Sequence, residues 1–97
     1  MEKPIIALAT PAVKGALAII RTSGNGVFAI TDQLFSKKVT GTDKQTMVFG
    51  TLKDGDQIID QVVLLIYPAS ASMTGEDVVE ISCHGSMVIV HQIIEAY

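Results

Sequence analysis

The chain has 97 residues and a net charge of −3, and 48% of its residues are hydrophobic while only 18% are charged. This composition excludes a disordered chain, and the scattered Lys and Arg residues exclude an independent nucleic-acid-binding surface, which needs a basic patch. The single Cys excludes an intramolecular disulfide and is typical of a reducing compartment. The longest apolar run, residues 62–67, is far below the ~20 residues that span a bilayer. We therefore expect one soluble, cytoplasmic domain that fills residues 1–97, with no membrane contact.

The first half of the chain predicts two strands followed by a helix. Residues 5–9 form a short apolar strand candidate that ends at Thr10-Pro11, and residues 12–15 are predicted to form a turn. Residues 16–21 are a second apolar run, in which Ile19 and Ile20 favour a buried strand. A glycine-containing loop follows at residues 22–26, and the spacing of apolar residues over 27–35 predicts an amphipathic helix.

The middle of the chain predicts a β-hairpin. Residues 36–44 are polar and form a surface loop, and residues 46–52 alternate as a strand does. Asp54-Gly55-Asp56 has the Asp-Gly sequence of a tight hairpin turn. Residues 58–67 form the partner strand, and because this strand is almost continuously apolar we expect both of its faces to be covered.

The last third predicts a small-residue loop at 69–72, a strand and a helix. Apolar Val79, Ile81 and Cys83 alternate with polar residues, and helical spacing begins at about Ser86, a candidate N-cap. The helix carries no stop signal before Tyr97, so we interpret the chain as the N-terminal part of a longer protein. The predicted fold class is α+β, with a mixed, largely antiparallel sheet and two helices on one side.

The adjacent Cys83 and His84 suggest a thiolate–imidazole nucleophile. Neighbouring residues on a strand point to opposite faces, however, so these two side chains are not placed to share a proton. Cys83 lies on the apolar face with Val79 and Ile81, and we interpret it as a buried hydrophobic residue.

A metal site is a second alternative, and it has no supporting motif. Its candidate ligands would be Glu76, Asp77, Glu80, His84 and His91. They show neither the Cys-x-x-Cys nor the His-x-x-x-His spacing of metal sites, and the last of them is expected on a different element. We therefore predict no metal-ligating residues.

Glu80 and Arg21 are the strongest candidates for ligand binding. Glu80 shares a strand face with Ser82 and His84; this face is either simply solvated, or Glu80 accepts paired N–H donors from a heterocycle such as an amino-pyrimidine. Arg21, the only Arg, is either a strand-end residue with its stem on apolar surface or a planar fork for a carboxylate or carbonyl group. The residues alone leave both choices open.

Two segments resemble the N-terminal domain of the bacterial and organellar tRNA modification GTPases of the MnmE/TrmE family. The first comprises residues 6–11 and 15–24, with Arg21-Thr22-Ser23-Gly24 at its end. The second is Thr74-Gly75-Glu76-Asp77-Val78-Val79-Glu80-Ile81 with Cys83-His84-Gly85. Asp60 and Pro68, on either side of the long apolar strand, also lie where the family places such residues, so the resemblance covers essentially the whole chain.

The resemblance implies a fold similar to the tetrahydrofolate-binding domain of aminomethyltransferases. Such a domain forms a homodimer and binds 5-formyl-tetrahydrofolate near the dimer interface. The remainder of a family member carries a helical domain with an inserted G domain that hydrolyses GTP with Mg²⁺ and K⁺. With a flavin-dependent partner, MnmG (also called GidA), it forms a heterotetramer that modifies the 5-position of the wobble uridine in certain tRNAs.

Two residues of the chain match the folate-contacting residues of the family. The Arg of the Arg-x-Ser-Gly motif matches Arg21, and the Glu of the Glu-Asp-Val-Val-Glu motif matches Glu80. The chain departs from the family at Val13 and Ser86, where Gly is usual, which changes the backbone freedom of two turns. The other folate contacts come from later in the family's sequence, so we expect this chain alone to bind folate weakly and to be non-catalytic.

Three hypotheses follow from the sequence. The first is a folate-binding and dimerisation domain of a tRNA modification GTPase, with Arg21 and Glu80 as the cofactor-binding residues. The second is a non-catalytic interaction module that dimerises through its apolar surface without folate. The third is an independent small enzyme that uses Cys83 and His84.

Overall fold

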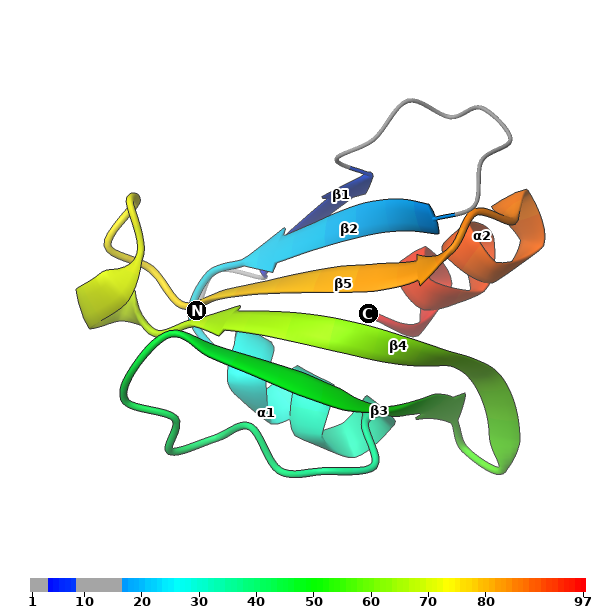
Figure 1. Cartoon of the computed structure of the whole chain (residues 1–97), viewed down its shortest axis with the longest axis horizontal. Coiled ribbons are helices and arrows are strands. Elements are labelled where there is room, and N and C mark those ends of the chain that lie inside the picture. Colours follow the sequence, from blue (N-terminus) through cyan, green and yellow to red (C-terminus); the bar gives the residue numbers. More distant parts are fainter. Residues whose placement is uncertain (1–3, 9–16) are drawn as a thin grey trace.

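The computed structural model describes residues 4–8 and 17–97, which form one five-stranded sheet and two α-helices. The elements in chain order are β1 (Ile5–Leu8), β2 (Leu17–Ser23), α1 (Val27–Leu34), β3 (Thr46–Asp54), β4 (Gln57–Tyr67), the short 3₁₀ helix η1 (Ala69–Ala71), β5 (Val78–His84) and α2 (Met87–Ala96). The strand order is β1-β2-β5-β4-β3, and every pair is antiparallel (Figure 1). The predicted α+β class with an antiparallel sheet is confirmed, and the turn predicted at residues 12–15 lies outside the described residues.

The last strand in sequence, β5, lies at the centre of the sheet. It pairs with β2 on one side and with β4 on the other, so within the sheet it connects the β1–β2 pair to the β3–β4 hairpin. Glu80 is opposite Arg21 in β2 and opposite Leu65 in β4. The register therefore brings residues 59 positions apart in sequence into direct cross-strand contact distance.

The hydrophobic core lies between one face of the sheet and the two helices. The strands contribute alternate residues, as the pattern of exposed and buried positions along β2 illustrates. The fully or almost fully buried residues of this cluster include Ile20, Leu52, Val62, Leu64, Ile66, Val79, Ile81 and Cys83 from the sheet, Val27 from α1, and Val90 and Ile93 from α2. Because residues of both helices join the same cluster, both helices cover the same face, as predicted; α1 lies behind β3 in Figure 1.

The two helices are fixed by local hydrogen bonds and by one contact between them. Ser86 is the N-cap of α2, and its hydroxyl accepts a hydrogen bond from the backbone N–H of Ile89 at 3.5 Å, which confirms the predicted cap. The hydroxyl of Thr31 in α1 donates to Val27 O at 2.8 Å and lies 2.8 Å from the hydroxyl of Tyr97. Tyr97 therefore donates to Thr31, and burial raises the pKa of this tyrosine to about 12.

Strand β2 is longer than the sequence predicts. Thr22 and Ser23, expected to belong to a loop, continue the strand, and the chain turns only at Gly24. Thr22 is fully buried, and its hydroxyl donates to the carbonyl of Val79 at 2.9 Å. A β-branched residue whose hydroxyl is hydrogen-bonded is suited to a buried strand position. The residues around Thr22 do not reveal this bond, because its acceptor, Val79, is distant in the sequence.

The expectation that both faces of β4 are covered is wrong within the described residues. Val63, Leu65 and Tyr67 are only half-buried, because both helices pack on the opposite face. We call this helix-free side the outer face. Its side chains include those of Ile5, Leu17, Ile19, Arg21, Met47, Phe49, Val63, Leu65, Tyr67, Glu80, Ser82 and His84. Several are large and exposed, including Leu17 at 63%, Met47 at 70% and Phe49 at 58%.

Leu64 and Leu65 are neighbours on β4 that face opposite sides, and they provide a direct test of this arrangement. Leu64→Ala should lower the free energy of unfolding by about 2–5 kcal/mol, because it leaves a cavity in the core. Leu65→Ala should lower it by roughly half as much or less, because this side chain is already partly in water. Urea unfolding at a concentration where the chain is monomeric measures both, and equal losses would contradict the assignment of the two faces.

Candidate functional site

Arg21 and Glu80 form an ion pair on the outer face. Arg21 Nε lies 3.6 Å from Glu80 Oε2, and the two side chains are 51% and 23% exposed. An exposed pair of this kind contributes only about 0–1 kcal/mol to stability. Among residues 4–8 and 17–97, the other guanidinium N–H donors of Arg21 and the second carboxylate oxygen of Glu80 have no side-chain partner. The structure thus brings the two residues singled out from the sequence together, with hydrogen-bonding capacity left for a ligand.

The surroundings of this pair form rows across β2, β5 and β4. The first row contains Arg21, Glu80 and Leu65; the second contains Ile19, Ser82 and Val63; the third contains Leu17 and His84. Glu80, Ser82 and His84 therefore form a polar line along β5, and apart from Arg21 the neighbours in these rows are aliphatic. We call this line the β5 strip.

His84, at the end of the β5 strip, is held by Asp60 of β4. The Asp60 carboxylate accepts a hydrogen bond from the backbone N–H of His84 at 2.9 Å, and His84 Nδ1 lies 2.8 Å from Asp60 Oδ1. The Asp60 side chain is only 9% exposed, whereas that of His84 is 66% exposed. Sequence reasoning did not select Asp60 as a site residue. The available signal was a single acid in residues 58–67, which are apolar apart from Asp60 and Gln61.

Cys83 does not meet the side chain of His84. Cys83 is 1% exposed and belongs to the core, whereas His84 is on the outer face. Burial raises the pKa of the Cys83 thiol, and the negative charge of Asp60 raises it further. Both effects disfavour the reactive thiolate, so the geometry does not support an enzyme that uses this pair.

The other polar residues named from the sequence have structural or solvent-exposed positions. Asp77 Oδ1 accepts a hydrogen bond from the backbone N–H of Ala69 at 2.8 Å, and His91 is exposed on α2. Within residues 4–8 and 17–97, no group of three or more His, Cys, Asp or Glu side chains is arranged to hold a metal ion. Over the same residues, no helix has the length and apolar character needed to cross a membrane.

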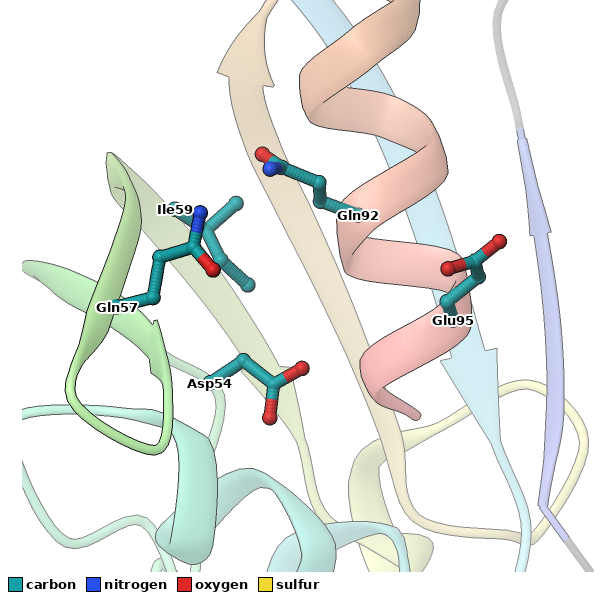
Figure 2. A pocket seen from close by; sticks show the side chains of 5 residues that line it. All are labelled: Asp54, Gln57, Ile59, Gln92 and Glu95. Carbon is teal, nitrogen blue, oxygen red and sulfur yellow. The ribbon is translucent and has the colours of Figure 1, made fainter.

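A separate hollow of about 200 Å³ lies between the β3–β4 hairpin and α2 (Figure 2). It is lined by Asp54, Gln57, Ile59, Gln92 and Glu95. In Figure 2 the side chains of the hairpin and those of α2 line opposite sides of this hollow. None of the residues predicted to bind a ligand reaches it, and it contains no cationic or aromatic side chain. The outer face remains the better candidate, because it alone combines an Arg, a Glu and apolar surface.

The fold and the outer face define a small α+β domain that presents a charged pair within an apolar sheet surface. A family model described as GTP-binding protein TrmE N-terminus matches residues 4–97, and the chain belongs to this family.

Similar proteins include three curated relatives, each called tRNA modification GTPase MnmE. That of Chlorobium luteolum is 46% identical over 96% of this chain and 21% of its own length. Those of Flavobacterium psychrophilum and Chlamydia caviae are 44% and 46% identical, over 94% and 95% of this chain and 21% of their lengths. The chain thus spans about a fifth of the length of these relatives.

The buried position of Cys83 has a measurable consequence. We expect the thiol of the folded chain to resist alkylation by iodoacetamide, because it is shielded from solvent and its pKa is raised. In denaturant the same thiol should be alkylated quickly, as mass spectrometry would show. Equally fast modification of folded and unfolded protein would contradict the assignment of Cys83 to the core.

Proposed function

We propose that this chain is the N-terminal 5-formyl-tetrahydrofolate-binding and homodimerisation domain of a GTPase that modifies the wobble uridine of certain tRNAs. Family membership and the names of the relatives support the tRNA-modification context. Because the chain spans about a fifth of those relatives, GTP hydrolysis with Mg²⁺ and K⁺ is assigned to the segments that they have beyond it. The flavoprotein MnmG, tRNA and a cytoplasmic location belong to the same proposal.

The observation that carries the folate proposal is the Arg21–Glu80 pair on the outer face. The Glu80 carboxylate can accept two N–H donors from the amino-pyrimidine edge of a pteridine, a bidentate arrangement that a carboxylate favours. The planar Arg21 guanidinium, 3.6 Å away, can donate to a ring carbonyl or to the formyl oxygen. The apolar neighbours Ile19 and Leu65 provide a surface for the flat faces of the ligand's rings.

The exposed hydrophobic residues of the outer face support the homodimer proposal. Met47 and Phe49 on β3 are more than half exposed, and they share the outer face with Leu65. A large apolar patch on a sheet is typical of a protein–protein interface. A second copy that packs on β3 and β4 would cover this patch, and it would leave the ligand site at the border of the interface.

The second candidate function is an interaction module that dimerises but binds no folate. It is favoured by the same apolar residues, which need a covering partner whether or not a ligand is present. The two candidates differ in the role of Glu80, which the interaction module does not need.

Folate binding is best measured in a longer protein, because the resemblance to the family implies further folate contacts outside these 97 residues. We define the fusion protein as this chain joined to the segments that follow in the Chlorobium luteolum relative. In it, Glu80→Ala should weaken 5-formyl-tetrahydrofolate binding by about 10–100-fold, because charge-assisted hydrogen bonds to the pteridine are lost. Isothermal titration calorimetry measures the change.

Glu95→Ala is the matched control, since this carboxylate lies in the hollow beside α2 and should leave affinity unchanged. If the unmodified fusion protein gives no heat of binding and no folate-dependent thermal shift, the interaction module replaces the folate proposal. Equal affinity of wild type and Glu80→Ala would remove Glu80 from the site.

Dimerisation can be tested with a charge on the outer face. Phe49→Lys should convert the dimer to a monomer in sedimentation velocity, because burying an unpaired ammonium group in an apolar interface is costly. Val88→Lys is the control, because this α2 residue is 67% exposed and does not lie on the outer face. A dimer that persists in Phe49→Lys would show that the interface is elsewhere.

A further inference from the structure

The Asp60–His84 pair fixes which nitrogen of His84 is available to a ligand. A carboxylate has acceptor oxygens only, so a hydrogen bond between Asp60 and His84 Nδ1 requires the proton to be on Nδ1. In the neutral ring Nε2 then carries the free lone pair. His84 lies opposite the outer-face residue Leu17 and its side chain is 66% exposed, so we place this acceptor within reach of a ligand on the outer face.

The hydrogen bond between the His84 ring and Asp60 is not needed to complete the hydrogen bonding of the sheet. The backbone N–H of His84 is satisfied by Asp60 Oδ2 at 2.9 Å, and that bond alone would complete the end of β5. The additional bond to the ring orients an exposed side chain whose own burial contributes little to folding. A buried carboxylate that orients an exposed imidazole is typical of a histidine with a binding or chemical role.

The position of His84 relative to Glu80 limits what it can bind. The two residues are four positions apart on one strand face, which is a separation of about 13 Å along β5. Between them the row of Ile19, Ser82 and Val63 offers a mainly aliphatic surface. Along the β5 strip the outer face thus presents a charged pair, then Ser82 between two aliphatic side chains, and then a hydrogen-bond acceptor.

A folate molecule has its chemical groups in a matching order. Its pteridine is followed by a benzene ring, and this ring is joined by an amide to glutamate. We infer that His84, positioned by Asp60, binds the benzoyl-glutamate end of the folate by accepting a hydrogen bond from its amide N–H at Nε2. The inference rests on the folate proposal above, with the pteridine at Arg21 and Glu80 and the benzene ring over Ile19 and Val63.

The test compares two ligands in the fusion protein by calorimetry. His84→Leu should weaken binding of 5-formyl-tetrahydrofolate about tenfold, the effect of one lost hydrogen bond, and should leave binding of 5-formyl-6-methyl-tetrahydropterin unchanged. The pterin lacks the benzoyl-glutamate end, so only a direct contact with that end produces this difference. His84→Gln should recover part of the affinity, because its amide oxygen can accept a hydrogen bond near the position of Nε2.

His91 is an exposed histidine of α2, so His91→Leu is the matched control. This variant should bind both ligands as the wild type does. Asp60→Asn should also weaken folate binding but not pterin binding. The Asn amide can donate to Nδ1, which moves the ring proton to Nε2 and removes the acceptor. The ¹⁵N chemical shifts of the His84 ring report this change of tautomer directly.

The outcomes separate the inference from the proposal beneath it. Equal effects of His84→Leu on both ligands, or no effect on either, would overturn the inference. The Asp60–His84 pair would then have only a structural role at the end of β5. Absence of folate binding in the unmodified fusion protein would instead overturn the folate proposal and, with it, the inference. A loss confined to the full folate, partly recovered by His84→Gln, supports the contact.

Discussion

The pairing of β5 with both β2 and β4 is the constraint on which the rest of the structure depends. Because this strand is central, it places Glu80 opposite Arg21 on one side and brings His84 to Asp60 on the other. The same register directs Cys83 into the core. Loss of the pairing with β2 would separate Arg21 from Glu80, and loss of the pairing with β4 would separate His84 from Asp60.

The two faces of this sheet have separate roles. The inner face, with Ile20, Leu64 and Ile81 against the helices, supplies the apolar burial that stabilises a small domain. The outer face contributes less to folding, so its residues are free to serve binding. Exposure of the apolar side chains of Met47 and Phe49 to water is unfavourable, and a second copy that covers them would remove this free-energy cost.

Local sequence patterns predicted most of the helices and strands, but not the order in which the strands pair. Alternation predicted β3 and β5, Asp-Gly predicted the hairpin, and Ser86 predicted the start of α2. The chemistry of Arg21 and Glu80 was also visible, because an Arg and a Glu on otherwise apolar strands are conspicuous. Their 3.6 Å approach depends on strand order, which no local pattern contains, and the roles of Asp60 and of the buried Thr22 depend on it too. The apolar β4 was misread because one of its faces is open rather than covered by helices.

The central claim is that the helix-free face of the sheet is the ligand-binding face. Hydrogen–deuterium exchange of the fusion protein with and without 5-formyl-tetrahydrofolate tests it most directly, since bound ligand slows the local opening of the backbone it contacts. The account predicts ligand-dependent protection in peptides from β2 and β5, with peptides from the hollow beside α2 unchanged. Protection confined to that hollow, around Gln57 and Gln92, would contradict it.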